Sequence, residues 1–413
     1  MPPDQSPSPC VLPAAAGNGV TLRTVVALNL TSTLAQVGQY GVGFVVLPLW
    51  LVHLGLSPSW LGLIGALQWF GMLLGIQVAP RIIARLGARR SVTLGLVCSA
   101  TGFALLPVAS VLGWSVAAAA IGFGLGLRWI SLEPWLYGLI PQQLRGRIVG
   151  LHETLIGVAP IAAPALVAWL GMGRLTPTAL ALGATVLGLL PLAWATRPDM
   201  PHPDRKGVDE GFGLRPLALG VAIAAGGGFV EGSFTVLVPL MGNGWGLSSQ
   251  QMAWLLTVYG ASGLLLQLPL GWLADRSGVR AAALAVVTVA LLGFVTLALA
   301  RGNAAITAGI FMLGGSVNAF LTLAMIAAVT AHEVAASRAV ARISWYFTAS
   351  SGVGPLVLGP VLERLGASTL PLLLGAALLP LGFVLLAMRG RRSTPGAVLP
   401  AVAEAGAPAR PLP

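Results

Sequence analysis

The sequence Gly271-Trp-Leu-Ala-Asp-Arg-Ser-Gly-Val-Arg280 lies between two long apolar runs and places an acidic residue among basic ones. A related sequence, Pro80-Arg-Ile-Ile-Ala-Arg-Leu-Gly-Ala-Arg89, occurs 191 residues earlier. The same offset aligns three further pairs, namely Pro48 with Pro239, Gly55-Leu-Ser57 with Gly246-Leu-Ser248, and Pro164 with Pro355. One offset shared by separate landmarks indicates that the chain consists of two related halves.

The composition is that of a membrane protein. Of 413 residues, 56% are hydrophobic and only 8% are charged, whereas a soluble protein carries about 25% charged residues. So few charges cannot cover a soluble globule, and the continuous apolar runs favour spanning helices over the alternating strands of a β-barrel. The formal net charge is +11. Because the arginines stand singly or in small groups between apolar runs, we expect no nucleic-acid partner.

A helix needs about 20 apolar residues to cross the bilayer core. The apolar runs predict an all-α polytopic membrane protein with twelve transmembrane helices in two pseudo-symmetric six-helix bundles. The predicted spans are 23–52, 59–83, 90–109, 112–139, 145–171, 175–196, 215–241, 249–274, 279–300, 303–331, 335–362 and 368–388. The predicted organisation is a disordered tail at 1–21, a bundle at 22–196, a linker at 197–214, a bundle at 215–388 and a disordered tail at 389–413.

Basic residues predict the orientation. They are concentrated in the even-numbered connections between predicted helices, while the opposite connections hold only Arg174, Arg301 and Arg364. The positive-inside rule therefore places both termini in the cytoplasm. Residues 1–20 lack the basic start of a signal peptide, so we expect an integral, multi-pass protein of the plasma (inner) membrane. Its partners would be the lipid bilayer, protons and a small-molecule substrate, and we expect a monomer.

The loop at 271–280 resembles the signature G-x-L-a-D-R-x-G-R of the major facilitator superfamily (MFS), with Val279 in the position of its first arginine. The first-half copy differs more, because Pro80 replaces the glycine and Ala84 replaces the aspartate. Gly352-Val-Gly354-Pro355 is similar to the Gly-Pro element that this family carries in helix 11. The resemblance implies the MFS fold and secondary transport by alternating access. It also implies a gating role for Gly271, Asp275, Arg276, Gly278, Arg280, Arg85, Gly87 and Arg89.

The resemblance further implies that Asp275 latches the two halves together on the cytoplasmic side. At the end of helix 8 a carboxylate can lie against the positive N-terminal dipole of helix 5, near Arg145 and Arg147. Ala84, which aligns with Asp275, cannot form the matching contact in the first half. The alternative is a solvated charged turn that only sets the topology.

Ionisable residues inside membrane helices are costly, so each is a candidate for function. Glu231 lies sixteen residues past Arg215, roughly 24 Å along a helix and so near the middle of the bilayer. The 191-residue offset aligns it with Tyr40, which ends a polar stripe on helix 1. We therefore expect Glu231 to face a central cavity and to carry a proton. The alternative is a structural glutamate bound to a neighbouring helix.

Arg128 and Glu133 are five residues apart, or about 140° around a helix, so we do not expect them to pair with each other. Arg128 is a candidate for binding an anionic group of the substrate, or Glu231 itself. Glu133 and Glu153 have similar depths on adjacent helices and could share a proton, with His152 beside them. Alternatively, either carboxylate pairs with the loop arginines.

The other candidate cavity residues are polar or aromatic. Trp345 is the strongest aromatic candidate, because it lies one turn beyond Arg342 in a polar and aromatic stretch. The full set of expected cavity residues is Asn29, Thr33, Gln36, Gln39, Tyr40, Gln68, Arg128, Phe234, Tyr259, Asn318 and Trp345.

The sequence contains no glycine-rich nucleotide loop, metal-ligand cluster or nucleophile–histidine–acid arrangement. We therefore expect no enzymatic activity, no cofactor and no bound metal. The leading hypothesis is proton-coupled efflux of amphipathic compounds, because the expected cavity is rich in aromatic residues. The alternative is a proton-coupled uptake symporter for a sugar or organic anion. A third hypothesis is a non-transporting membrane receptor.

Overall fold

The computed structural model describes residues 17–108, 110–140, 144–195, 215–330 and 336–388, and these residues form helices and connecting turns without a strand. The helices of the first half are α1 (Gly17–Gln36), the π-helical segment η1 (Val37–Val46), α2 (Leu47–His53), α3 (Pro58–Leu86), α4 (Ala88–Leu105), α5 (Val111–Leu139), α6 (Arg145–Gly157), α7 (Ala159–Leu170), α8 (Thr176–Leu187) and α9 (Leu189–Trp194).

The second half repeats this order. Its elements are η3 (Arg215–Leu217), α10 (Ala218–Leu237), η4 (Val238–Leu240), α11 (Met241–Gly244), α12 (Ser249–Ser277), α13 (Val279–Ala298), α14 (Asn303–Val329), α15 (Ala336–Leu365), η5 (Ala367–Thr369) and α16 (Leu370–Ala387). The predicted linker and C-terminal tail lie outside the described residues. Helix α1 begins at Gly17, inside the stretch expected to be a tail.

Ten helices of the described chain are long and apolar enough to span a membrane. The two remaining predicted spans, 90–109 and 335–362, fall largely on α4 and α15. Both helices carry arginines and several other polar residues, which lower their mean hydropathy. Together these elements form the all-α, polytopic fold with two six-helix bundles that the apolar runs predict.

The duplication is visible in the local geometry of the backbone. Helices α3 and α12 both span 29 residues and begin and end at positions 191 residues apart. Each is followed by a glycine with positive φ, namely Gly87 (φ 78°) and Gly278 (φ 81°). A residue with a Cβ atom is strained in this conformation, so glycine is favoured where each helix stops and the chain turns into the next helix.

Proline produces a second matched irregularity. Pro48 and Pro239 lack the backbone N–H that would continue an α-helical hydrogen-bond ladder. The ladder becomes π-helical in η1, immediately before Pro48, and 3₁₀-helical in η4, which contains Pro239. The wide turns of η1 also carry Gly38 and Gly41, where an added Cβ would lie only 2.3 Å and 2.6 Å from atoms of α8 and α7. Helix 1, the continuous span formed by α1, η1 and α2, therefore packs closely against its neighbours where it is irregular.

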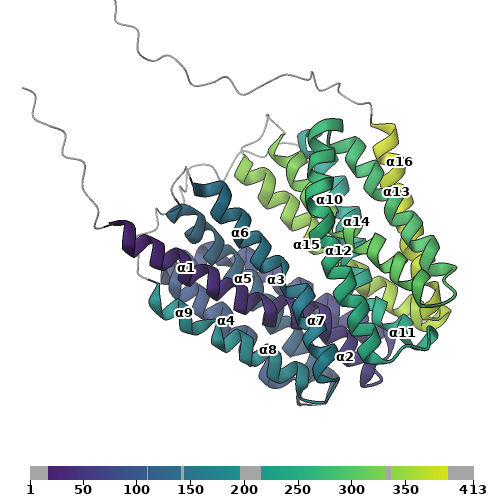
Figure 1. Cartoon of the computed structure of the whole chain (residues 1–413), viewed down its shortest axis with the longest axis horizontal. Helices are drawn as coiled ribbons and strands as arrows, with labels where there is room; N and C mark the ends of the chain where they lie inside the picture. The colour runs from purple at the N-terminus through teal and green to yellow at the C-terminus, as the bar shows by residue number, and fades with distance from the viewer. Residues whose placement is uncertain (1–16, 109, 141–143, 196–214, 331–335, 389–413) are drawn as a thin grey trace, which may run out of the picture.

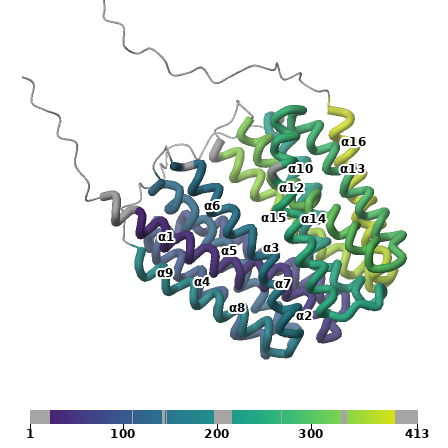
Figure 2. The backbone as a smooth tube through the Cα atoms, in the orientation of Figure 1, coloured from purple at the N-terminus to yellow at the C-terminus, as the bar shows by residue number. Residues whose placement is uncertain are grey.

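The two halves form a V (Figure 1). Helices α1–α9 lie on one side and α10–α16 on the other, and the two groups approach each other near α2, α7 and α12. They diverge toward the beginning of α1 and the end of α16, as the backbone trace also shows (Figure 2). We call the diverging end, which carries Gly87 and Gly278, the arginine-rich face. The end that carries Gly55 and Gly246 is called the opposite face.

Contacts between the halves are found at the opposite face. A Cβ added to Gly62 of α3 would lie 2.2 Å from the carbonyl oxygen of Pro355 of α15, so these helices pack backbone to backbone. At the exposed end of α15, beyond the predicted span, Glu363 accepts a hydrogen bond of 3.1 Å from the backbone N–H of Ser59. Hydrogen bonds from the Ser59 side chain and backbone hold the pKa of the Glu363 carboxyl below its usual value.

Candidate substrate and proton site

A cavity of about 250 Å³ lies between the two halves. Its wall combines aromatic rings, three carboxylates and one guanidinium group. The first half contributes Gln36, Tyr40, Trp69, Met72, Leu125, Arg128, Trp129, Glu133, Glu153, Ile156, Gly157 and Pro160. The second half contributes Glu231, Gln267, Asn318, Leu321, Ser344, Phe347 and Thr348. Glu153 and Gln267 are solvent-exposed, and both lie on the segments nearer the arginine-rich face, so the cavity is accessible from that side.

Close helix packing places Glu231 in the wall. Gly228 and Gly232 of α10 face α15, where an added Cβ would lie 2.4 Å from the carbonyl oxygen of Phe347 and 2.0 Å from that of Ser351. Glu231, on the same helix, retains only 6% of its exposed surface. Its carboxylate forms no hydrogen bond or ion pair within the described part of the chain, and it lies within electrostatic range of the Tyr40 phenol. It is therefore available to a proton or a bound cation.

Arg128 of α5 is held by neutral side chains of helix 1. Its Nε donates to Gln39 Oε1 at 2.6 Å, and Nη1 donates to Ser32 Oγ at 3.0 Å. Its Nη2 donates to Gln36 Oε1. Ser32, Gln36 and Gln39 occupy successive turns of one helical face and can therefore bind a single guanidinium group together. Only Gln36 belongs to the polar stripe of Asn29, Thr33, Gln36 and Tyr40 that was predicted on helix 1. The positive charge is satisfied by hydrogen bonds but is not neutralised by them.

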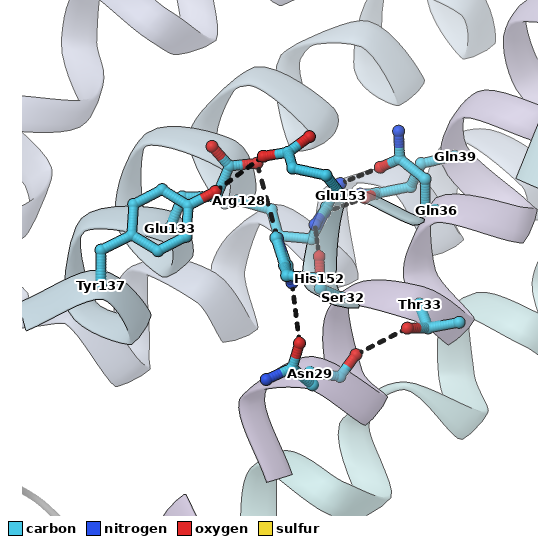
Figure 3. Close-up of polar contacts among 10 residues, drawn as sticks. All are labelled: Asn29, Ser32, Thr33, Gln36, Gln39, Arg128, Glu133, Tyr137, His152 and Glu153. Atoms are coloured by element: carbon cyan, nitrogen blue, oxygen red, sulfur yellow. Dashed lines mark hydrogen bonds and ion pairs between the residues drawn. The ribbon is translucent and has the colours of Figure 1, made fainter. Parts of the chain in front are cut away.

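Glu133, His152 and Glu153 meet at the arginine-rich side of the cavity (Figure 3). His152 Nε2 lies 3.9 Å from Glu133 Oε1, and His152 Nδ1 lies 3.0 Å from Asn29 Oδ1. Tyr137 donates a hydrogen bond of 2.8 Å to Glu153 Oε1. The similar depths of these residues in adjacent helices had predicted that both carboxylates and the histidine lie close together. It did not reveal the contacts to Asn29 and Tyr137, which depend on how α1, α5 and α6 are rotated.

Arg128 and Glu133 both line the cavity. They form no direct ion pair in the described structure, which agrees with their angular separation on α5, although each lies within electrostatic range of the other. Neither Glu133 nor Glu153 is paired with an arginine among the described side chains. The side chain of Arg145 lies outside the described part, and Arg147 is exposed.

Several expected cavity residues lie behind the lining. Gln39 connects Arg128 to Ser99, with 2.7 Å between Gln39 Nε2 and Ser99 Oγ. Thr33 donates to the backbone carbonyl of Asn29 at 2.8 Å. Asn29 does not line the cavity either, because its side chain contacts His152. The remaining members of this group are buried packing residues, namely Gln68, Phe234 and Tyr259.

Trp345 was expected to line the cavity and lies outside its lining. Its side chain is 45% exposed and its ring packs edge-to-face on Tyr346, with 5.2 Å between centroids, outside the cavity. The cavity is lined instead by Ser344, Phe347 and Thr348. These three positions have the spacing of one helical face, whereas Trp345 is rotated about 100° from Ser344. Proximity to Arg342 in sequence was a poor guide to the face, and the i, i+3, i+4 pattern was the better signal.

The expected gating loops also have a structural role, which their sequences did not predict. Arg280 Nε donates to the backbone carbonyl of Leu385 at 2.6 Å, and Arg89 Nη2 donates to that of Ala193 at 3.2 Å. Each arginine thus binds carbonyl groups at the end of the last helix of its own half, where unpaired carbonyls and the helix dipole favour a cation. The equivalent positions of the two arginines carry equivalent contacts.

The other charged residues of the two loops include several that are exposed. Arg276 stacks over Trp272 with its Cζ 4.1 Å from the ring centroid. Asp275 is exposed and forms no hydrogen bond or ion pair within the described residues. Arg85 is likewise exposed, and an added Cβ at Gly271 would meet no atom within 4 Å. The expected latch is therefore not engaged in this conformation, in which the two halves diverge at the arginine-rich face.

Comparison with known proteins agrees with this architecture. The family model of the Major Facilitator Superfamily matches residues 28–230 and 217–412. An uncharacterized MFS-type transporter of Enterobacter sp. (strain 638) is 26% identical over 357 residues, which cover 85% of this chain and 92% of the relative.

Two solved structures share the fold. A mutant of the nucleoside transporter NupG has a TM-score of 0.73 at 15% identity and covers 89% of this chain and 100% of its own. The D-xylose-proton symporter has a TM-score of 0.71 at 15% identity and covers 89% of this chain and 98% of its own. The two matches to the family model together span nearly the whole sequence. This chain is therefore a multi-pass integral membrane protein that belongs to the Major Facilitator Superfamily of transporters.

Proposed function

We propose that the protein exports amphipathic cations in exchange for protons, by alternating access of a central site between two bundles at 22–196 and 215–388. The observation that carries this proposal is the charge of the cavity wall. Three carboxylates, Glu133, Glu153 and Glu231, face a single guanidinium group that neutral side chains already hold. Aromatic rings, including Trp69 and Trp129, supply the apolar contact surface and can bind cations on their faces.

This charge balance gives a physical reason for exchange. When the cavity closes, its wall loses water, and carboxylates without a counter-charge are expensive to bury. A proton on Glu231 removes one negative charge, and a bound cation compensates one. Either ligand therefore permits closure, while the empty and deprotonated site resists it. A transporter that closes when either a proton or a cation is bound, but stays open when neither is bound, exchanges the two ligands across the membrane.

The described conformation is consistent with the loading state of an exporter. The halves touch at the opposite face, and the cavity is accessible from the arginine-rich face. We propose that the arginine-rich face is cytoplasmic and that the protein works as a monomer in the inner membrane. A cytoplasmic cation would then enter between α5, α6, α12 and α15, and closure of the arginine-rich face would follow its binding.

Uptake of a sugar or organic anion together with protons is the second candidate. A guanidinium group has five N–H donors, and Arg128 uses three of them on Gln36, Gln39 and Ser32. The remaining donors and Asn318 would suit hydroxyl or carboxylate groups. Symport predicts that substrate and protons move in the same direction, so the sign of pH-driven movement separates the two candidates.

The test is flux in proteoliposomes with ethidium as the cation and labelled D-xylose as the sugar. Efflux by exchange predicts that an imposed pH gradient drives ethidium against the proton flow and leaves xylose unaffected. Glu231→Gln should weaken acceleration by the gradient while ethidium exchange at equal pH persists, since a glutamine cannot carry the proton. Gradient-driven xylose flux, or ethidium flux that is unchanged in Glu231→Gln, would count against the proposal.

A further inference from the structure

His152 has the surroundings of a proton-binding group. It is fully buried, and its Nε2 has no hydrogen-bond partner among the described residues. The nearest ionisable group is Glu133, whose Oε1 lies 3.9 Å from Nε2. Buried polar atoms in folded proteins are nearly always hydrogen-bonded. A buried nitrogen that lacks a partner and faces a carboxylate therefore requires an explanation that packing does not provide.

Asn29 determines which ring nitrogen carries the hydrogen. The Asn29 amide nitrogen donates to the carbonyl oxygen of Val25 at 2.9 Å, so the amide oxygen points toward His152. That oxygen lies 3.0 Å from His152 Nδ1 and can only accept. The network thus assigns the hydrogen of the neutral ring to Nδ1 and leaves a lone pair on Nε2. In Figure 3 the ring lies between Asn29 on one side and Glu133 on the other.

Two acceptors then face each other across the Nε2–Glu133 contact. A neutral Nε2 and an ionised carboxylate gain nothing from this approach, whereas a proton on Nε2 converts it into a charge-assisted contact. We propose that His152 and Glu133 bind one proton as a unit, on Nε2, and that Asn29 sets the tautomer that makes this possible. The pair would be a second proton site, separate from Glu231. Its role in transport rests on the proposed proton coupling.

The surrounding charges explain why Glu133 is the partner. Tyr137 donates to Glu153 and so occupies an oxygen of that carboxylate, while its ring packs edge-on against the imidazole with 5.9 Å between centroids. Glu153 and Arg128 act on the pair only through space. The Glu133 side chain retains 18% exposure and lines the cavity. A proton can therefore reach Nε2 from the cavity through the Glu133 carboxylate.

Protonation of the pair would change the charge that the cavity must bury. With a neutral imidazole the pair carries one negative charge, and with the proton it carries none. The physical argument for closure therefore applies at this site as well as at Glu231. The pair lies on the side of the cavity that is accessible in this conformation, where a proton would be released as the cation enters.

The first test observes the imidazole directly. The protein is prepared with ¹⁵N-labelled histidine, and the His152 signal is identified among the four histidines as the one missing from His152→Asn. At high pH the spectrum should show a protonated Nδ1 and an unprotonated Nε2, and acidification should protonate Nε2. A signal with Nε2 protonated at high pH, or one that never changes between pH 5 and 9, would overturn the proposal. This readout is independent of transport.

The second test counts protons. His152→Asn keeps an amide N–H near the Nδ1 position and removes the base, while Glu133→Gln keeps the shape of the partner. Each variant should lower the number of protons exchanged per ethidium ion by one, with Glu231-dependent coupling intact. An unchanged ratio in a folded Glu133→Gln protein would refute the pair. Absence of any coupling in the parent would instead refute the proposed function, while the imidazole spectrum would still decide whether the pair binds a proton.

Discussion

Gly62 offers a direct test of whether the contact at the opposite face controls the conformation of the protein. Its missing side chain lets α3 approach α15 until an added Cβ would lie 2.2 Å from the carbonyl oxygen of Pro355 and 3.1 Å from Cα of Gly359. Real Cβ atoms essentially never approach closer than 3.0 Å. The substitution Gly62→Ala therefore requires the two helices to separate by about 1 Å, since close-packed interiors cannot absorb the overlap.

The expected magnitude follows from two opposing terms. Overpacking of this kind costs about 1–3 kcal/mol, and replacing glycine by alanine inside a helix recovers about 0.5–1 kcal/mol. A net penalty of about 1 kcal/mol corresponds to roughly a fivefold change in the ratio of two conformations. The penalty falls only on the conformation in which α3 and α15 touch. Gly62→Ala should therefore shift the population toward separation at the opposite face.

The assay is a distance measurement by electron paramagnetic resonance. Spin labels at Leu54 and Leu365, which are 40% and 58% exposed at this face, report the separation of the two halves in a background without native cysteines. Gly183→Ala in α8 is the matched control, because its added Cβ meets no atom within 4 Å. Gly62→Ala should enlarge the long-distance population and the control should not. Identical distance distributions in the two variants, or a loss of thermal stability alone, would refute the reasoning.

Three further predictions concern charged residues at the two faces. Glu363→Gln should also separate the opposite face, and acidification should do the same in the parent. A carboxyl whose pKa is lowered by a contact stabilises that contact above its ordinary pKa and loses the effect as the pH falls through the lowered value. The same spin labels measure the effect of the substitution and of acidification. A Glu363→Gln protein that is as pH-sensitive as the parent would contradict this role of Glu363. Arg280→Ala should lower the thermal unfolding temperature more than Arg89→Ala, because its hydrogen bonds are shorter and a charged hydrogen bond contributes about 1.5–3 kcal/mol. Calorimetry in detergent measures both variants, and unfolding temperatures equal to that of the parent would contradict a stabilising role for these bonds. Asp275→Asn should reduce ethidium flux more than Ala84→Ser, and equal tolerance at both positions would reduce the loop to a topology signal.

The fold could be predicted from the sequence because membrane helices appear as long apolar runs and the two halves carry recognisable repeats. The offset between the loops matched the ends of α3 and α12 to the residue. The π-helical segment η1 was not foreseen, because its hydrophobic residues give no sign of a wider turn and only Pro48 marks its end. The early start of α1 at Gly17 was missed because a helix can continue past the apolar run that identifies it.

Only those parts of the site that follow the helical period could be predicted from the sequence. Asn29, Gln36 and Tyr40 lie on one stripe, so their common direction could be read from their spacing. The contact between Asn29 and His152 joins residues 123 positions apart and depends on the rotation of two helices, which no local pattern encodes. The exposed position of Trp345 shows the complementary failure, since a neighbour in sequence was treated as a neighbour in space.

Helices α3 and α12 connect the two faces, and this has a consequence for gating. Each has 29 residues and is therefore about 43 Å long. One end of α3 touches the second half at the opposite face, through Ser59 and Glu363, while the far end of α12 carries Asp275 at the arginine-rich face. Rigid helices of this length that pivot near the cavity must separate at one end when they meet at the other. The contact of Glu363 and the Asp275 carboxylate, which has no partner among the described residues, then belong to the same state. The proposed latch at Asp275 should form only after the Glu363 contact has opened.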